Sequence, residues 1–520
     1  MIHPSILHTL ERAAGERPGH ACLIDLAGEV TYRELLVQVS TVTAWLADIG
    51  LRRRQRVGIH LPKTREEVVA TVAVGAARGV FVNLNYQWTS DQVLFVSDDC
   101  DIDILITDQR RANQLLEEGR AGRFQHMLVV GEAPETRMTA WSSLVGLSAR
   151  LEMPIGSDLA ALLYTSGSSG TPKGGMVTHG QLQRGAEIVS HYLGMGANER
   201  VLSVPPLSFD YGLNQLTSVL LHQATLCLQK VPIASEIVKS ARRWNVTGLP
   251  LVAPSWVQVS RYLESAKETL EGLRYLTNTG GAIPTDVLDL LPKLFPGADI
   301  FLMYGLTEAF RSTFLPPALY PTKRGAIGRA IPNVEIFVVD PQRGICGPNE
   351  TGELVHRGDL ISLGYWRREV DTLERIRSNH HLGDLIGDEK VVHSGDLVRY
   401  DDDGVLWFLG RADGMIKTSG YRVSPTEVEL AASKVEGVGS AVAFGVADHE
   451  LGQRIHLVVE SEDPALKEVD IIGVLRTLLP SYMVPMQVFV QLTAFPRTSS
   501  GKIDRQSVID AVRNRSGYGP

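Results

Sequence analysis

The chain has 520 residues, of which 44% are hydrophobic and 21% charged, and its formal net charge is -8. A chain of this length can bury more than one core, so we expect more than one domain. The acidic balance, without an extended basic stripe, argues against a nucleic-acid partner. The cysteines form no CxxC pattern and no Cys/His cluster, which argues against zinc and a disulfide scaffold and is typical of a reducing cytoplasm: Cys22, Cys100, Cys227 and Cys346.

The first nineteen residues, MIHPSILHTLERAAGERPG, predict an amphipathic helix. Charged residues interrupt its short apolar face at Glu11, Arg12, Glu16 and Arg17. This pattern is unlike a signal peptide and unlike a membrane span. We therefore expect a cytoplasmic protein without a membrane partner.

Apolar runs typical of strands alternate with helical patterns over the first three hundred residues or so. RVGIHL (56–61), TREEVVATVAVGAARG (64–79) and VFVNLN (80–85) predict a strand, a helix and a strand. The theme returns at VLSVPPLSFD (201–210), ATLCLQK (224–230), VTGLPLVAP (246–254), YLTNTGG (275–281) and ADIFLMYGLTE (298–308). Such alternation predicts parallel sheets covered by helices, with ligands gathered at the strand ends.

The texture changes in the last two hundred residues. After Arg324 the segments are shorter and more β-like, as in VEIFVVD (334–340), GELVHRG (352–358) and VLWFLG (405–410). From about Asp413 a small α/β unit begins, with a helix opened by Ser or Thr at 424–437 and strands at 438–448 and 454–460.

The stretch 162–180, LLYTSGSSGTPKGGMVTHG, crowds hydroxyl side chains and glycines around Lys173. Hydroxyls and glycine-freed backbone N–H groups form a chemically suitable cradle for a polyphosphate. The stretch does not match GxxxxGK[ST], so it is not an ordinary P-loop. A solvated Ser/Gly linker is the alternative that composition alone would favour.

Six separated stretches favour the polyphosphate cradle over the linker, because they occur in the order seen in the adenylate-forming superfamily. That superfamily contains acyl-CoA synthetases, stand-alone amino-acid adenylation enzymes and luciferases, and the chain resembles it from the N-terminal helix to Arg505. The stretches are YTSGSSGTPKG, TNTGGAIP, YGLTEA, SGDLV, GRADGMIKTSGYRV and PRTSSGKIDR. One departure is Gly175, where the superfamily usually has a bulkier residue, and we expect it to loosen the strand that follows.

The resemblance implies an α/β fold in which a large domain, residues 1–412, binds ATP and the acid. This domain contains helix-covered, mainly parallel sheets and a small β-barrel-like subdomain. A small mobile α+β domain, residues 413–520, follows it.

The resemblance also implies a set of ATP-binding residues. The loop would wrap the β- and γ-phosphates, the small residues after 279 would line the adenine slot, and Tyr304 would stack on the base. Thr307 would contact phosphate, Asp396 would accept from the ribose hydroxyls, and Arg411 would touch ribose or phosphate. The implied set is Thr165, Ser166, Gly167, Ser168, Ser169, Gly170, Thr171, Lys173, Gly280, Gly281, Ala282, Tyr304, Gly305, Thr307, Asp396 and Arg411.

Some of these residues have ordinary structural alternatives. Tyr304 alone is more often a core aromatic, Asp396 a turn or N-cap residue, and Arg411 a surface ion pair. Glu308, with Thr165, would hold Mg²⁺, a cation that prefers oxygen ligands.

Lys502, in PRTSSGKID, is implied as the catalytic lysine, together with Glu308 and Thr165. Its alternative is an exposed surface lysine. In the superfamily the matching lysine meets the substrate carboxylate and the α-phosphate, and then leaves when the small domain rotates. The implied hinge is Asp413, and the thiol-transfer face would carry Gly420, Tyr421 and Arg422.

The acid pocket is implied to contain Phe209, Asp210, Gly280, Phe310 and Arg311. In LSFDYGLNQL, Asp210 would pair with a substrate ammonium, because an unpaired buried cation is costly. Asp210 also stands where the N-cap of a helix over 211–223 belongs. Arg311 could meet a second carboxylate of the substrate or an internal acidic partner.

FLMYGLTEAFRSTFLPP and LSFDYGLNQL resemble two groups more closely: exosortase-associated AMP-forming acyl-CoA ligases, and stand-alone enzymes that load proline or β-amino acids onto carrier proteins. The implied activity is adenylation of a small acid, with an amino acid favoured, followed by transfer to the phosphopantetheine thiol of an acyl or peptidyl carrier protein. A synthetase using a fatty or aryl acid and free CoA is the alternative. A luciferase-like monooxygenase and a catalytically inactive nucleotide-binding regulator are less favoured.

Overall fold

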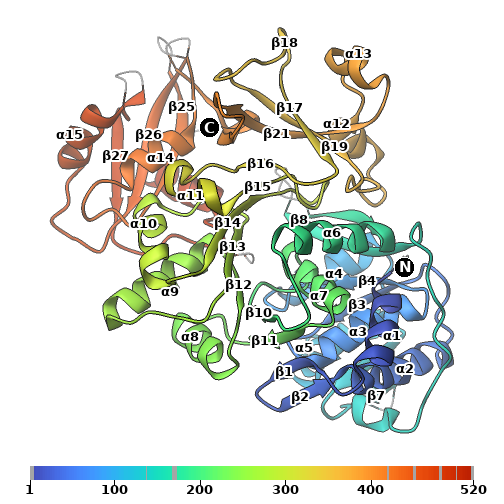
Figure 1. Ribbon diagram of the computed structural model, residues 1–520. Helices are drawn as coiled ribbons and strands as arrows, with labels where there is room; N and C mark the ends of the chain where they lie inside the picture. Colours follow the sequence, from blue (N-terminus) through green and yellow to red (C-terminus); the bar gives the residue numbers. More distant parts are fainter. Residues whose placement is uncertain are drawn as a thin grey trace.

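The part of the chain that the structure describes forms four β-sheets, three in a large N-terminal part and one in a smaller C-terminal part (Figure 1). The structure is a computed structural model that describes residues 5–135, 137–166, 172–418, 421–448, 452–479, 483–498 and 501–516. The expected α/β class, with helix-covered parallel sheets followed by a small C-terminal domain, is confirmed.

The first sheet has seven strands in the order β7-β6-β5-β3-β4-β8-β9. Its neighbours pair in parallel except for β8 and β9, which form an antiparallel hairpin at one edge. The expected cradle therefore includes the end of β8, the start of β9 and the residues between them. The strands are β3 (Arg56–His60), β4 (Val80–Asn83), β5 (Ile104–Asp108), β6 (His126–Val130), β7 (Met138–Ala140), β8 (Leu159–Ser166) and β9 (Pro172–Thr178).

The second sheet has nine strands in the order β16-β15-β14-β13-β12-β10-β11-β1-β2. The strands from β14 to β1 pair in parallel, and antiparallel strands close both edges. The strands are β1 (Ala21–Asp25), β2 (Gly28–Thr31), β10 (Arg200–Ser203), β11 (Thr225–Leu228), β12 (Gly248–Val252), β13 (Tyr275–Thr279), β14 (Asp299–Tyr304), β15 (Thr313–Leu315) and β16 (Arg329–Ala330).

Five helices share one core with strands of both sheets, so they lie between the sheets: α1 (Ile6–Glu16), α2 (Tyr32–Asp48), α3 (Arg65–Ala76), α6 (His179–Tyr192) and α7 (Asp210–His222). α3 is buried at every position from Glu67 to Ala76, which explains why its sequence shows no polar face. A capping box opens α2, in which Thr31 and Glu34 satisfy each other's backbone N–H groups. The other helices of the first 300 residues are α4 (Ser90–Asp99), α5 (Gln109–Glu117), α8 (Ala234–Arg243), α9 (Ala253–Ala266) and α10 (Thr285–Leu294).

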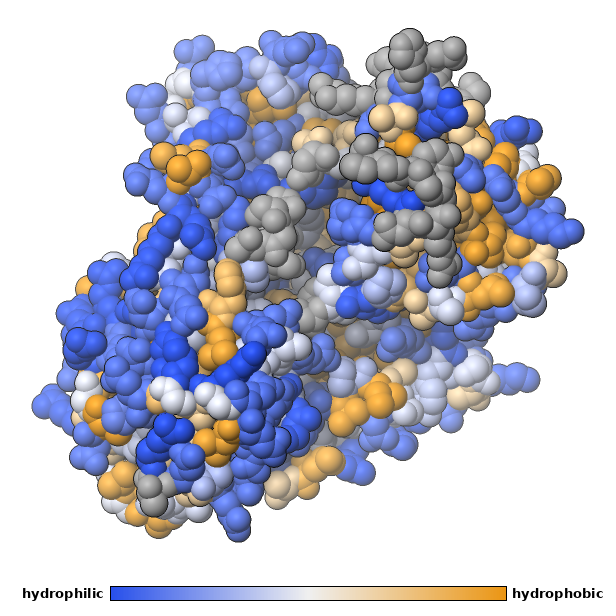
Figure 2. All heavy atoms as spheres, turned by 180° about the vertical axis from the view of Figure 1, so that it is seen from behind, coloured by the Kyte–Doolittle hydropathy of each residue, from blue (hydrophilic) through white to orange (hydrophobic). Residues whose placement is uncertain are grey.

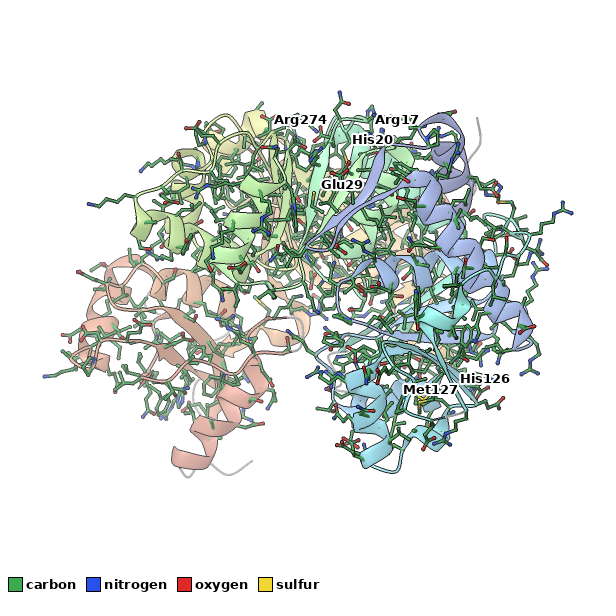
Figure 3. All side chains as sticks on the ribbon, turned by 90° about the horizontal axis from the view of Figure 1, so that it is seen from below. Arg17, His20, Glu29, His126, Met127 and Arg274 are labelled. Atoms are coloured by element: carbon green, nitrogen blue, oxygen red, sulfur yellow. The ribbon has the colours of Figure 1, made fainter. Side chains whose placement is uncertain are left out.

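The amino and carboxyl ends of the parallel strands carry different chemistry. At the amino ends of the nine-stranded sheet, Arg274 pairs with Glu199 at 2.5 Å, and Arg17 donates to the carbonyls of Ala197 and Gln223 at 2.9 and 3.0 Å. Figure 3 shows Arg274, Arg17 and His20 along this edge. These contacts tie α1 and the sheet together. The residues expected to bind ATP and the acid follow the opposite, carboxyl ends, as parallel sheets favour.

The third sheet is antiparallel, as the shorter β-like segments after Arg324 predict. Its strand pairing follows an open path, β18-β17-β19-β21-β20, with β22 also on β21. The elements of this region are α11 (Tyr320–Lys323), β17 (Val334–Asp340), β18 (Gly344–Ile345), β19 (Gly352–Gly358), α12 (Glu369–Arg375), β20 (Ile376–Arg377), α13 (Gly383–Ile386), β21 (Val391–Tyr400) and β22 (Leu406–Arg411).

The C-terminal part is a five-stranded sheet packed against helices, with its own apolar cores. Its first helix begins as predicted, with the Ser424 side chain accepting from the Glu427 N–H. The elements are β23 (Ile416–Thr418), β24 (Tyr421–Val423), α14 (Pro425–Ala432), β25 (Ser440–Asp448), β26 (Gly452–Glu460), α15 (Glu468–Leu478), β27 (Gln487–Gln491) and α16 (Arg505–Ser516).

The surface seen in Figure 2 is mainly hydrophilic, with small separate hydrophobic areas. Within the described part of the chain, no helix combines the length and the apolar character that crossing a bilayer requires.

Gly212, in the first turn of α7, shows how tightly the chain is packed where it enters the site. A Cβ atom at this position would lie 2.1 Å from the Pro206 carbonyl oxygen and 2.5 Å from that of Pro205. The segment 205–209 can therefore cross the start of α7 only because residue 212 has no side chain.

We expect Gly212→Ala to lower the free energy of unfolding by about 1–3 kcal/mol, since the added methyl must displace backbone. Thermal unfolding followed by calorimetry measures this. Gly15→Ala is the matched control, because a Cβ at Gly15 in α1 meets nothing within 4 Å and should be neutral or stabilising. Equal behaviour of the two variants would contradict the packing argument.

Candidate active site

The β8–β9 hairpin places the expected triphosphate residues at the edge of the seven-stranded sheet. Thr165 pairs with Lys173 across the hairpin, and Ser166 pairs with Pro172. The expected phosphate-binding residues Gly167, Ser168, Ser169, Gly170 and Thr171 lie outside the described residues. Lys173 is described, and its ammonium forms an ion pair with Asp371 in α12. Sequence reasoning did not find Asp371, which lies 198 positions away.

Gly175 is held on both sides, so the expectation of a loosened strand is wrong. It pairs with Leu163 in β8 and forms a bridge with Tyr365 on the other side. A Cβ atom at Gly175 would lie 3.0 Å from the Thr307 methyl group. Glycine here lets the YGLTE segment approach the hairpin, and this close approach is the physical reason for the departure.

Glu308, the expected Mg²⁺ ligand, is half-buried and accepts a hydrogen bond from the Tyr365 hydroxyl. Burial first, and then the Glu308 charge, raise the pKa of Tyr365, so it remains a donor. Among the described residues no cluster of three or more His, Cys, Asp or Glu side chains forms a metal site. A single carboxylate fits a Mg²⁺ ion whose remaining ligands come from phosphates and water.

The segment expected to line the adenine slot follows the carboxyl end of β13. Gly280 has a φ of 78°, a left-handed conformation that glycine adopts without strain. The Asn278 side chain donates to the Gly281 carbonyl at 2.9 Å and so holds the turn, which continues into Ala282.

Tyr304 and Asp396 meet across two sheets. The Tyr304 hydroxyl donates to Asp396 Oδ2 at 2.5 Å, and Arg411 Nη1 lies 3.1 Å from Asp396 Oδ1. Burial and the Asp396 charge raise the pKa of Tyr304. Gly305 is required after Tyr304, because a Cβ there would lie 2.7 Å from the Phe310 carbonyl oxygen. The structure thus brings three of the expected residues, Tyr304, Asp396 and Arg411, into direct contact.

Lys502 reaches this group from the C-terminal part. Gly501, which precedes it, has a φ of 81°, and the Thr498 N–H donates to the Lys502 carbonyl at 2.7 Å. Its Cε atom lies 3.7 Å from the position of a Cβ on Gly280. Lys502 is exposed at its surface, yet the protein around its ammonium desolvates it enough to lower its pKa. Asp210 and Asp396 oppose this shift, whereas Arg411 adds to it.

The acid pocket contains an internal ion pair. Arg311 is 1% exposed, and its Nη1 lies 2.6 Å from Asp210 Oδ2. The guanidinium also lies over the Tyr211 ring, 5.1 Å from its centre, while its Nε and Nη2 have no hydrogen-bond partner among the described residues. Of the two expected roles for Arg311, the structure contains the internal acidic partner.

Phe209 and Phe310 directly precede the two members of this ion pair, Asp210 and Arg311. The N-cap of α7 is Phe209, and no side chain caps the helix, so the N-cap interpretation of Asp210 is wrong. Asp210 is instead the first residue of the helix. Phe310 has a φ of 57° and is buried against Gly185, where a Cβ would lie 2.3 Å from its ring. This backbone turn directs the next residue, Arg311, toward Asp210.

Lys63, which sequence reasoning also missed, holds the segment that leads to Asp210. Its ammonium donates to the Ser203 hydroxyl at 3.0 Å and to the Pro205 carbonyl. Burial lowers the pKa of Lys63 and raises that of its buried neighbour Glu67. No local motif marks Lys63, because its partners lie on another sheet.

A cavity of about 20 Å³ lies beside Tyr211, between α6, α7 and the second sheet. That space holds about one water-sized group. Three polar side chains of α7 line it, and each has a buried polar atom without a protein partner among the described residues: Asn214, Gln215 and Ser218. The chamber is therefore small and partly polar.

The expected hinge lies in the short 3₁₀ turn Ala412–Gly414, between β22 and β23. The side chain of Asp413 is outside the described residues, as is Gly420. Tyr421 and Arg422 are on β24, and their side chains are likewise not described. Their roles stay predictions.

Residues 10–366 match the AMP-binding enzyme family, and residues 427–502 match the AMP-binding enzyme C-terminal domain. The chain belongs to the AMP-binding enzyme family. This confirms the resemblance to adenylate-forming ligases and the expected enzyme class.

Curated relatives of this AMP-binding enzyme are much longer proteins. It is 26% identical over 505 residues to bacitracin synthase 3 of Bacillus licheniformis, covering 96% of this chain and 8% of the relative. It is 28% identical over 515 residues to phenyloxazoline synthase MbtB of Mycobacterium sp. (strain MCS), covering 96% of this chain and 41% of the relative. The chain thus spans less than half of either relative.

Solved structures share the fold along almost the whole chain. An anthranilate CoA ligase, AuaEII, in complex with anthranoyl-AMP has a TM-score of 0.89 at 21% identity and covers 99% of this chain and 98% of its own. The o-succinylbenzoate CoA synthetase of Bacillus subtilis, with ATP and magnesium, has a TM-score of 0.84 at 24% identity and covers 96% and 99%.

The electrostatic surroundings of Lys502 generate a prediction that needs no turnover. We expect its pKa to lie below the ordinary lysine value of 10.5. Asp210→Asn should lower it further, because a raising charge is lost, and Arg411→Gln should raise it, because a repelling charge is lost. The measurement is the pH dependence of amine labelling at the Lys502 peptide, read by mass spectrometry. Lys434, which is exposed, serves as the internal reference, and shifts of the same sign in both variants would contradict the arrangement.

Proposed function

We propose that the chain adenylates a small carboxylic acid, in the first place an amino acid, with ATP, and passes the acyl group to the phosphopantetheine thiol of a carrier protein. One observation carries the adenylation step. Lys502, from the C-terminal part, lies against Gly280, and the charges of Asp210 and Asp396 both act on its ammonium. A cation therefore stands between the expected acid and ribose positions.

In this reaction a carboxylate oxygen of the acid attacks the α-phosphorus of ATP, and the bond to the oxygen bridging the α- and β-phosphates breaks, so that pyrophosphate leaves. Lys502 would offset the negative charge where the carboxylate and the α-phosphate meet. Asp396 would hold the ribose, and Glu308 with Thr165 would hold Mg²⁺. The Mg²⁺, when bound, would neutralise part of the triphosphate charge.

The thioester step then needs access for a thiol. The thiol would lose its proton to solvent as its sulfur attacks the acyl carbonyl carbon. The bond between that carbon and the phosphate oxygen would then break, and AMP would leave with its electron pair. Lys502 would first be withdrawn by rotation of residues 413–520 about Asp413. The turn Ala412–Gly414, between two strands, suits such a backbone change.

The acid pocket supports a small, partly polar substrate. The chamber beside Tyr211 holds about 20 Å³ and is lined by neither Asp210 nor Arg311, so it would add the space of about one water-sized group to a pocket formed around that ion pair. Asp210 is the carboxylate that would accept from an ammonium, in addition to the contact that its Oδ2 makes with Arg311. The relatives named bacitracin synthase 3 and linear gramicidin synthase also support an amino acid and a carrier protein.

A synthetase acting on an unaminated acid with free CoA is the second candidate, and Arg311 is the observation that favours it. Arg311 already neutralises Asp210 within the pocket, which reduces the need for a substrate cation. The fold shared with CoA ligases is compatible with this candidate.

Acid-dependent ATP/pyrophosphate exchange separates the two candidates. With a panel of α-amino, β-amino, aryl and fatty acids, we expect an amino acid to drive exchange. Asp210→Asn should then raise the KM for that acid about tenfold or more, with the KM for ATP little changed, because a charge-assisted contact is lost.

Two further variants keep this test interpretable. Asp210→Asn leaves the Arg311 charge unpaired, so Asp210→Asn/Arg311→Gln restores a neutral pocket and should still lose the amino acid. Asp299→Asn, at the exposed amino end of β14, is the matched control. Exchange with unaminated acids alone, unaffected by Asp210→Asn, would instead give first place to the CoA synthetase.

Lys502→Ala should slow the adenylation half-reaction by about 10²-fold or more, because one preorganised charge is lost where charge develops. Binding of ATP should change much less. Thioester formation from a chemically prepared acyl-adenylate should be spared, since Lys502 is withdrawn in that step. Lys434→Ala controls for a change of charge on the C-terminal part, and equal losses in both half-reactions would contradict the role.

A further inference from the structure

Two ionisable groups expected to meet the triphosphate and its metal are held by one short segment of the chain. The segment 363–371 includes the end of the connection from β19 and the first residues of α12, and residues 363–366 of it lie antiparallel beside β9. Lys173 forms an ion pair with Asp371, and Glu308 accepts from the Tyr365 hydroxyl. Both partners come from this segment, and neither belongs to the motifs that predicted the site.

Backbone hydrogen bonds fix the segment onto the hairpin. The Met176 N–H donates to the Gly364 carbonyl at 2.8 Å, the Leu363 N–H donates to Met176 at 3.0 Å, and the Trp366 N–H donates to Gly174 at 2.8 Å. Residues 363–366 thus cover the outer edge of β9, with Tyr365 bridged to Gly175. Asp371 is held by a backbone that is itself anchored to the strand carrying Lys173.

Side chains anchor the same segment to α4. Arg368 Nη2 lies 2.6 Å from Asp99 Oδ1, and the Tyr164 hydroxyl of β8 donates to the other oxygen of Asp99 at 2.6 Å. Tyr164 in turn lies under Gly174, where a Cβ would be 2.9 Å from its ring. The position of Asp371 is therefore set by a network around the hairpin, rather than by Lys173 alone.

The ion pair is partly shielded from solvent. The side chain of Lys173 is 18% exposed and that of Asp371 is 29% exposed, and the Lys173 ammonium lies 5.7 Å from the centre of the Tyr365 ring. An ammonium enclosed by Asp371 and the Tyr365 ring has few open directions in which it can donate to a second anion. A phosphate oxygen and the Asp371 carboxylate would compete for the same donors.

We propose that Asp371 is a counter-ion that the triphosphate must replace at Lys173. This inference rests on the proposed binding of ATP by the β8–β9 hairpin. Asp371 keeps the ammonium in place before the nucleotide binds, and its negative charge then opposes the β- and γ-phosphates. Departure of pyrophosphate restores the original pair, so Asp371 favours release of the leaving group.

The test is direct binding of Mg²⁺–ATP to the full chain by calorimetry, without any acid, beside binding of AMP. Asp371→Asn keeps the size of the side chain and removes its charge. We expect it to tighten ATP about three- to tenfold, the order of a partly exposed ion pair, and to leave AMP unchanged, because AMP has no β- or γ-phosphate. The unchanged affinity for AMP also shows that the variant is folded.

Two controls separate a specific exchange from a general loss of negative charge. Glu369→Gln removes an exposed charge from the same helix, and it should have little effect on ATP. In a Lys173→Met background, Asp371→Asn should no longer tighten ATP beyond the Glu369→Gln effect, which completes a double-mutant cycle.

Weaker ATP binding by Asp371→Asn, or an effect equal to that of Glu369→Gln, would overturn the proposal. Weaker binding would mean that Asp371 orients Lys173 for the nucleotide instead of competing with it. Because no acid is needed, these results stay separate from the proposed function. A failure to adenylate any acid would leave the comparison of ATP with AMP intact.

Discussion

The hydrogen bond from the Tyr304 hydroxyl to Asp396 joins the carboxyl end of the nine-stranded sheet to the antiparallel sheet, and the candidate site is assembled across this joint. Tyr304 ends β14, whereas Asp396 lies in β21 and faces Arg411 of β22. Without this hydrogen bond, Tyr304, expected to bind the base, would lose its direct contact with Asp396, expected to bind the ribose. The C-terminal part also contributes to this site, since Lys502 brings a cation against Gly280.

Charge balance is the second feature that unites the site. Asp210 is paired with Arg311, Lys173 with Asp371, and Asp396 with Arg411. Paired charges avoid the cost of an isolated ion in a poorly solvated place. They also hold the side chains in position before any substrate arrives, at the expense that a substrate must compete with an existing partner.

Much of the fold follows from local sequence signals. Apolar runs and helical patterns predict β3, α3 and β4, and Ser424 with Glu427 predicts the start of α14, because capping and burial act over a few residues. The N-cap of α7 was misassigned because Phe209 enters the helix in an extended conformation without a capping side chain.

The contacts that decide the chemistry are harder to predict, since they link distant parts of the chain. Arg311 and Asp210 are 101 positions apart, and Lys173 and Asp371 are 198 apart. A motif can indicate that Arg311 lies near the acid, but its partner depends on the turn at Phe310 and on how α7 packs. Gly175 likewise has a meaning only when Thr307 and Tyr365 are placed around it.

The backbone hydrogen bonds between residues 363–366 and β9 also limit where the large N-terminal part can be truncated without exposing a sheet edge. β9 is the last strand of the seven-stranded sheet, and without this cover its outer N–H and C=O groups would be open to pairing with another chain. A fragment that ended before residue 363 would expose that edge and invite aggregation. The hairpin with Lys173 and the segment after β19 are therefore one cooperative unit, although about two hundred residues separate them in the sequence.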